Sequence, residues 1–186
     1  MYLIIIEGTD NIGKDTLIQR LTENFNTVTL IHCDGPQGNC FQSQEQDNKF
    51  ICYANNIYDG LYDNTECIIM NRSHIGEYVY GQLYRKRNPY SINVMLDKVN
   101  EILLSRKDLT IKYVQLLSSS IKLRIKNDDN KSLSIKNEQL MKMENDLFLE
   151  VFDYIDLDKK LIYVNDEDVF LPKEEIYNEV LDFINE

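Results

Sequence analysis

The feature of the sequence that most constrains the fold is the segment IIIEGTDNIGKDT, residues 4–16. An apolar run typical of a buried strand leads into Gly8, four residues follow, and Gly13 and Lys14 stand where a helical pattern begins. Two glycines let the backbone come close to an anion, and the amides of the loop and of the first helical turn then point into one hollow. Lys14 adds a mobile positive charge. The spacing therefore predicts a phosphate-binding loop (P-loop) rather than a chance run of these residues.

The predicted loop ends differently from the usual pattern, in which a Ser or Thr follows the Lys and its hydroxyl ligates Mg²⁺. Here Asp15 has that position and Thr16 follows it. Two arrangements stay open. Either Asp15 contacts the metal directly or through water, or Thr16 ligates it and Asp15 is an acid at the helix N-terminus. The residues expected to form the phosphate site are Gly8, Thr9, Asp10, Asn11, Ile12, Gly13, Lys14, Asp15 and Thr16.

The rest of the chain alternates short β-type runs with helical patterns, which predicts a doubly wound α/β fold with a parallel sheet. Five runs are typical of strands, at residues 2–6, 27–32, 66–70, 111–117 and 160–164. Four apolar stripes at helical spacing lie between or after them: Leu17, Ile18, Leu21 and Phe25; Phe50, Tyr53, Ala54, Ile57 and Leu61; Leu140, Met143, Leu147 and Val151; and Ile176, Val180 and Ile184. We see no linker or repeat, so we expect a single domain over residues 1–186.

Composition excludes several classes of protein. The net charge of −11 disfavours a dedicated nucleic-acid binder, because such proteins usually carry an excess of Lys and Arg. The apolar opening is too short to cross a membrane, and no secretory signal is recognisable. Four cysteines without a CxxC pair, together with two histidines, make a structural zinc site unlikely. We therefore expect a cytoplasmic protein with reduced thiols and no membrane partner.

Four segments, in the same order, resemble those of thymidylate kinases. EGTDNIGKDT resembles that family's P-loop, with the acidic Asp10 at the third loop position. IIMNRSHIGEYVYGQLYR, residues 68–85, is similar to the Asp-Arg-Tyr or Asp-Arg-Ser segment of thymidylate and deoxynucleoside kinases. FICYANNIYDGLY resembles the helix that faces the nucleobase, and SSSIKLRIKNDDNKSLS falls where the family places its LID, here about residues 122–137.

The resemblance implies a P-loop NTPase fold with a five-stranded parallel sheet flanked by helices. It implies transfer of the γ-phosphoryl group of ATP to a deoxynucleoside monophosphate, with Mg²⁺, in a possible homodimer. The implied catalytic residues are Lys14, Asp10, which orients the substrate sugar, Arg72, which holds the acceptor phosphate, and Arg124, which covers the transferring group. The expected substrate-binding residues are Glu7, Asp10, Phe50, Tyr53, Asn56, Arg72, Ser73, Glu77 and Tyr80.

Several of these roles have a structural alternative. Arg72 could instead pair with a carboxylate such as Glu7 or Glu77, and Asp10 could cap its own loop. Arg124 could be an ordinary solvated helix residue. Aromatic residues at the spacing of Tyr78, Tyr80 and Tyr84 are more often core residues than a wall for base stacking, so we expect at least two of the three to be core residues. We expect His74 to be a hydrogen-bonded structural residue rather than a general base.

Two departures from the family pattern leave the substrate open. Asn71 stands where the family has an Asp, and Asn56 where thymidylate kinases tend to carry an Arg. From the resemblance we expect dTMP as acceptor, and because of these departures a related pyrimidine nucleotide fits the expectation as well. A deoxynucleoside kinase that acts on the 5′-hydroxyl, with Glu7 as the base, is the first alternative. A nucleotide-binding protein without catalysis is another, and the acidic charge disfavours a kinase acting on DNA.

Overall fold

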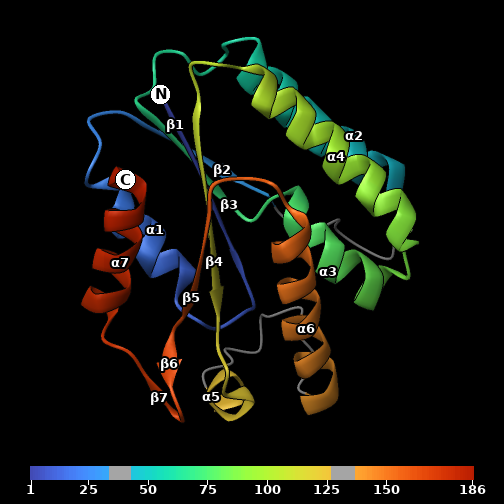
Figure 1. Ribbon diagram of the computed structural model, residues 1–186, viewed down its shortest axis with the longest axis vertical. Helices are drawn as coiled ribbons and strands as arrows, with labels where there is room; N and C mark the ends of the chain where they lie inside the picture. The colour runs from blue at the N-terminus through green and yellow to red at the C-terminus, as the bar shows by residue number, and fades with distance from the viewer. Residues whose placement is uncertain (34–42, 127–136) are drawn as a thin grey trace.

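The computed structural model describes residues 1–33, 43–126 and 137–186. Its centre is a five-stranded parallel sheet with the strand order β2-β3-β1-β4-β5 (Figure 1). The strands are β1 (Tyr2–Gly8), β2 (Val28–His32), β3 (Cys67–Asn71), β4 (Thr110–Leu117) and β5 (Lys159–Tyr163). The predicted fold class is confirmed, and the five predicted strands differ from the observed ones by at most two residues at either end.

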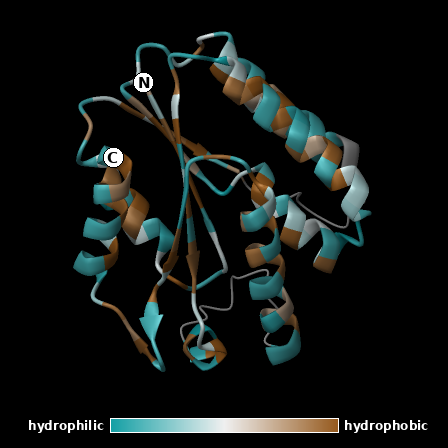
Figure 2. Ribbon diagram, viewed as in Figure 1, coloured by the Kyte–Doolittle hydropathy of each residue, from teal (hydrophilic) through white to brown (hydrophobic). Residues whose placement is uncertain are grey.

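The sheet has helices on both faces, and this explains why its central strands are continuous apolar runs. Helices α1 (Lys14–Thr22) and α7 (Lys173–Asn185) cover one face. The other face carries α2 (Ser43–Tyr58), α3 (His74–Arg85), α4 (Pro89–Ser105) and α6 (Glu138–Tyr154). Figure 2 shows that α7 turns its hydrophobic residues toward the sheet and its hydrophilic residues away from it.

Smaller elements gather at the carboxyl end of the sheet. Helix α5 (Ile121–Lys126) follows β4 there, and β6 (Asn165–Asp166) pairs antiparallel with β7 (Val169–Phe170) (Figure 1). The predicted LID lies partly outside the described residues, because residues 127–136 are not described. Among the described helices, none is both long and apolar enough to cross a membrane.

The buried face of α6 differs from the predicted stripe. The buried residues are Met141, Glu144, Phe148 and Val151, whereas Met143 is 42% exposed. Of the predicted stripe, only Val151 is buried, and Leu140 and Leu147 are half-buried. The prediction followed apolar residues alone, and it was wrong because a charged residue, Glu144, occupies a core position.

Glu144 is in the core because it pairs with Arg124, and both side chains are 0% exposed. The Arg124 guanidinium donates to Glu144, to the backbone oxygen of Met141 at 3.0 Å and to Asn145 at 3.3 Å. The hydroxyl of Tyr84 also donates to Glu144. The solvated alternative for Arg124 is therefore wrong. Its side chain is buried against Glu144, and its role beside the transferring phosphoryl group stays a prediction. Arg124 holds α5 against α6.

Breaking the Arg124–Glu144 pair should destabilise the fold strongly. Removal of one partner leaves a buried charge uncompensated, so Arg124→Met and Glu144→Leu should each cost about 3–5 kcal/mol of unfolding free energy in urea titrations. The double variant should recover most of this loss. The exposed pair Arg20–Glu174 is the control, and Glu174→Leu should leave the unfolding midpoint nearly unchanged. Additive losses in the double variant would contradict the pairing.

The observed face of α6 can be tested separately. Phe148→Ala should lower the free energy of unfolding by about 3–5 kcal/mol, because a fully buried ring leaves a cavity. Met143→Ala on the same helix should change it by less than about 0.5 kcal/mol, because the side chain is largely in water. Equal losses would contradict the difference in burial between Phe148 and Met143.

Candidate active site

The predicted P-loop joins the end of β1 to the start of α1 at the carboxyl edge of the sheet. Its backbone requires glycine at both ends. Gly8 has φ of 140°, and a Cβ there would lie 2.1 Å from the carbonyl oxygen of Leu116 in β4. Gly13 has φ of 91° and precedes the first residue of α1. A side chain at either position would strain or displace the loop.

The lysine of the loop is folded back onto the loop itself. The Nζ atom of Lys14 donates to the backbone oxygen of Gly8 at 2.9 Å and to that of Thr9. Burial, helped by the positive charge of Arg72, lowers the pKa of Lys14 to about 8. The ammonium group is thus held by neutral carbonyls in a poorly hydrated place, where an anion would stabilise its charge.

An ion pair joins the P-loop to the turn after β3. The guanidinium of Arg72 donates to the carboxylate of Asp10, and its central carbon lies 5.3 Å from the centre of the Tyr80 ring. The backbone of Arg72 is left-handed, with φ of 65°. The partner of Arg72 is thus Asp10 rather than either of the two carboxylates considered from the sequence. Two residues predicted to act in catalysis are therefore in direct contact.

Glu7 fixes the start of α3. Its buried carboxylate accepts from the backbone amide and the hydroxyl of Ser73, at 2.5 and 2.9 Å, and from the amide of Gly76 at 3.0 Å. Burial raises the pKa of Glu7, although nearby Arg72 opposes the shift. Within the described residues, the Oε2 atom of Glu7 has no hydrogen-bond partner. The Oε1 atom thus fixes the start of α3, and the Oε2 atom remains available to accept a hydrogen bond.

A second contact between the P-loop region and the end of β3 joins Asp15 to Asn71. The Nδ2 atom of Asn71 at the end of β3 donates to Oδ1 of Asp15 at 2.8 Å. Asp15 is exposed, and Thr16 is the next residue of α1. Asp15, Thr16 and Asn71 offer carboxylate, hydroxyl and amide oxygens, which are the kinds of ligand that bind Mg²⁺ in proteins. The residues present therefore fit the predicted metal.

A small pocket of about 30 Å³, here called the acceptor pocket, is lined in part by Arg72 of the Asp10–Arg72 ion pair. Six of the predicted substrate-binding residues line it: Glu7, Phe50, Arg72, Ser73, Glu77 and Tyr80. Four lining residues were absent from the prediction: Cys33, Gln46, Gly76 and Arg85. Gln46 lies one helical turn before Phe50 on α2, and that spacing was the one signal that could have revealed it.

Charged side chains form one wall of the acceptor pocket. The buried carboxylate of Glu77 accepts from Arg85 and, at 2.9 Å, from Arg87. Arg87 in turn donates to Asp47 of α2 at 2.8 Å. Each of these buried charges has an opposite charge beside it, which is the condition for burying them at tolerable cost. The network holds the Arg85 side chain at the pocket.

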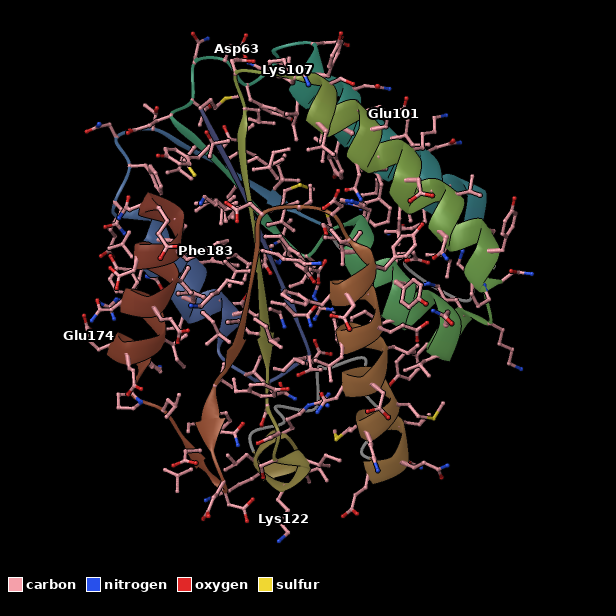
Figure 3. The ribbon with its side chains drawn as sticks, in the orientation of Figure 1. Asp63, Glu101, Lys107, Lys122, Glu174 and Phe183 are labelled. Atoms are coloured by element: carbon pink, nitrogen blue, oxygen red, sulfur yellow. The ribbon has the colours of Figure 1, made fainter. Side chains whose placement is uncertain are left out.

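Three predicted substrate residues are not among those that line the acceptor pocket: Asp10, which pairs with Arg72, and Tyr53 and Asn56 of α2. Asn56 lies near the other end of α2, where the backbone oxygen of Ile57 accepts from Arg106 just before β4. Arg106 also contacts Asp63 at 2.5 Å, and Figure 3 shows Asp63 at the end of the molecule opposite Lys122 of α5. Asn56 is therefore near the amino edge of the sheet. Tyr53 packs against the core, with Lys49 at 6.0 Å from its ring.

At least two of Tyr78, Tyr80 and Tyr84 belong to the core, as expected, although Tyr80 also lines the acceptor pocket. Tyr78 and Tyr80 are buried, and Tyr84 stacks on Tyr80 with ring centres 6.1 Å apart. His74 is buried at the start of α3, where Nε2 lies 2.9 Å from Oδ1 of Asn100. Burial lowers the pKa of His74 to about 4, so the ring is neutral at physiological pH.

A second pocket, here called the donor pocket, lies on the other face of the sheet and has a volume of about 200 Å³. P-loop residues Asn11, Ile12 and Gly13 form one side of it, next to Thr16 of α1. The other side comes from β7, α7 and the segment between them, residues 170–177. The P-loop thus has one pocket on each side.

No family model matches the chain, and a search of curated proteins finds no match either. Solved structures do match over nearly the whole length. The YorR protein from Bacillus subtilis, solved in complex with phosphorylated GDP, has a TM-score of 0.68 at 18% identity, covering 98% of this chain and 95% of that one. A deoxyadenosine kinase from M. mycoides with bound dATP has a TM-score of 0.59 at 16% identity, covering 99% of both chains.

The thymidylate kinase from Candida albicans is also similar, with a TM-score of 0.56 at 16% identity, covering 98% of this chain and 90% of that one. At such low identity, these matches establish the fold, and they agree with the five-stranded parallel sheet described above. The chain therefore has the P-loop fold found in nucleoside and nucleotide kinases.

Proposed function

We propose that this protein is a nucleotide kinase, which transfers the γ-phosphoryl group of ATP to a deoxynucleoside monophosphate such as dTMP or a related pyrimidine nucleotide. The observation that carries the proposal is the convergence of Lys14 and Arg72. Lys14 begins α1, Arg72 directly follows β3, and the two charges are close enough to interact. Arg72 lines the acceptor pocket, and Gly13, next to Lys14, lines the donor pocket. Phosphoryl transfer depends mainly on positioning and on positive charge around the moving group.

The P-loop supplies the donor side. Its amides and the start of α1 form a place for the polyphosphate, and Lys14 would exchange the carbonyls of Gly8 and Thr9 for phosphate oxygens. The base of the donor would occupy the donor pocket, which adjoins Gly13 and Thr16. Asp15 and Thr16 would hold Mg²⁺, with Asn71 orienting the Asp15 carboxylate. Bound there, the metal neutralises charge on the phosphates.

The acceptor pocket supplies the other substrate. Arg72 would exchange Asp10 for the acceptor phosphate, since a planar guanidinium can contact two phosphate oxygens at once. The carboxylate of Asp10, once it has left Arg72, would then bind the sugar. Phe50 and Gln46 come from one helix and offer an apolar ring and an amide to the base. Since the pocket measures only about 30 Å³, its ion pairs must rearrange when the acceptor binds.

A deoxynucleoside kinase is the second candidate, and one observation favours it. The Oε2 atom of Glu7 is buried at the acceptor pocket without a hydrogen-bond partner among the described residues. A carboxylate with a raised pKa is a stronger base for a 5′-hydroxyl proton. The two arginines at the same pocket, Arg72 and Arg85, favour an acceptor that already carries a phosphate.

A panel of acceptors separates these functions. ADP release should be measured with ATP, Mg²⁺ and each deoxynucleoside or its monophosphate. We expect turnover with monophosphates, and dTMP or another pyrimidine nucleotide should be the best acceptor. Turnover with nucleosides alone would favour the second candidate. Nucleotide binding without turnover on any acceptor would identify a non-catalytic binding protein and contradict the proposal.

Arg72→Ala tests the acceptor site directly. Loss of a charged hydrogen bond costs roughly 1.5–3 kcal/mol, so the acceptor KM should rise by about 10- to 150-fold, while binding of an ATP analogue stays within a few fold. Lys107→Ala removes an equal charge from an exposed site at the far end of the molecule and serves as control (Figure 3). An unchanged acceptor KM in Arg72→Ala would show that the acceptor phosphate binds elsewhere.

The pKa of Lys14 predicts a proton uptake on binding. Because the pKa of the free protein is about 8, most Lys14 side chains are neutral at pH 9. A bound triphosphate favours the charged form and raises this pKa, so the complex should take up a proton at that pH. Affinity for the ATP analogue should therefore fall as the pH rises above 8. Calorimetry in buffers with different ionisation enthalpies measures the uptake, which Lys14→Met should abolish; uptake that persists in the variant would exclude Lys14 as its source.

A further inference from the structure

The two pockets beside the P-loop differ in charge. The acceptor pocket has the carboxylates of Glu7 and Glu77 beside its arginines. The donor pocket is lined by two cations, Arg20 of α1 and Lys173 of α7, and none of the described residues that line it is an Asp or a Glu. The lining of the donor pocket therefore carries positive charge without a carboxylate.

The remainder of the donor pocket is mostly apolar, with six side chains: Ile12, Leu17, Leu116, Phe170, Leu171 and Ile176. An apolar cavity of ~150 Å³ is large enough to bind benzene, and the donor pocket measures about 200 Å³. It has room for a flat heteroaromatic base, which the ring of Phe170 can stack on. Because apolar contacts discriminate weakly between ligands of similar shape, selectivity for the base depends on the polar side chains of the lining.

Arg20 is held in place and still has hydrogen-bond donors to offer. Its two terminal nitrogens contact the Glu174 carboxylate at 2.8 and 3.1 Å, and its guanidinium carbon lies 4.0 Å from the centre of the Tyr177 ring. Figure 3 shows Glu174 at the outer side of α7. Within the described residues, the Arg20 side chain makes no other hydrogen bond. Two of its five N–H donors are thus used on Glu174, and three remain.

The other polar side chains add donors to the same pocket. Lys173, the first residue of α7, is exposed, and its ammonium group has three donors and no acceptor. Lys173 has no ion-pair partner in the part of the chain that the structure describes. The Thr16 hydroxyl can donate as well. The polar part of the lining therefore consists mainly of hydrogen-bond donors, two of them on cations.

We propose that the donor pocket binds guanine in preference to adenine, an inference that rests on the proposed kinase function and adds GTP to ATP as phosphoryl donor. Guanine has two neighbouring acceptors, O6 and N7, which a guanidinium contacts with two parallel N–H groups. Adenine has N7 beside the N6 amino group, a donor that would face the donors of Arg20. One bidentate contact of this kind discriminates against the wrong base by about 5- to 150-fold.

The test is calorimetric titration of the whole protein, with Mg²⁺, using non-hydrolysable analogues of GTP, ITP and ATP. The GTP analogue should bind at least about fivefold more tightly than the ATP analogue. The ITP analogue keeps O6 and N7 but lacks the 2-amino group, so it should bind within about threefold of the GTP analogue. An ITP analogue as weak as the ATP analogue would overturn the proposed contact with O6 and N7.

The outcomes separate the inference from the function on which it rests. If the ATP analogue binds as tightly as the GTP analogue or more tightly, the preference for guanine is overturned, while the proposed kinase function stands. If none of the three analogues binds, the proposed function fails together with the inference.

Substitution of Arg20 tests the residue that reads the base. Arg20→Met should lower the affinity for the GTP analogue to that for the ATP analogue, because it removes the donors and keeps an unbranched side chain. Glu174→Leu is the matched control, since it breaks the same ion pair but keeps the guanidinium, and it should retain the preference for the GTP analogue. Because the pair is exposed, both variants should fold. An unchanged preference in Arg20→Met, or its loss in Glu174→Leu, would contradict the proposal.

Discussion

The ion pair between Asp10 and Arg72 is the contact on which the candidate site depends, because it ties the P-loop to the turn after β3. The two segments are neighbours because β1 and β3 pair in parallel, with Ile6 opposite Asn71 at their carboxyl ends. Ligands of open α/β sheets bind at this edge. The sheet order therefore places a loop suited to phosphate and a guanidinium suited to phosphate next to each other.

Charges around this pair are buried, and each has a protein partner. Lys14 is held by two carbonyls, Glu7 by the start of α3, and Glu77 by two arginines. A buried charge without a partner is costly, so such groups stay ordered and close to their partners. A polyphosphate and an acceptor phosphate would replace carbonyls and carboxylates as the partners of Lys14 and Arg72. The free protein thus holds these cations close to where the proposed reaction would need them.

The sequence was most informative where burial leaves a continuous pattern. The five strands and the P-loop were predictable because apolar runs and two glycines at fixed spacing have few alternative structures. Arg124 was not predictable, because its partner Glu144 lies twenty residues further on and looks like a polar position within an apolar stripe. Gln46 lines the acceptor pocket and Asn56 does not, because only one end of α2 meets the pocket. Helical periodicity in the sequence does not tell which end this is. The two-residue strands β6 and β7 are too short to leave a pattern.

The most direct test of the central claim is a crystal structure with Mg²⁺ and a non-hydrolysable ATP analogue. The β- and γ-phosphate oxygens should lie within hydrogen-bond distance of the amides of Gly13 and Lys14. The Nζ atom of Lys14 should have left the carbonyls of Gly8 and Thr9 for a phosphate oxygen. An analogue bound away from the P-loop, or a Lys14 still bonded to those carbonyls beside bound phosphates, would contradict the claim that this loop holds the phosphoryl donor.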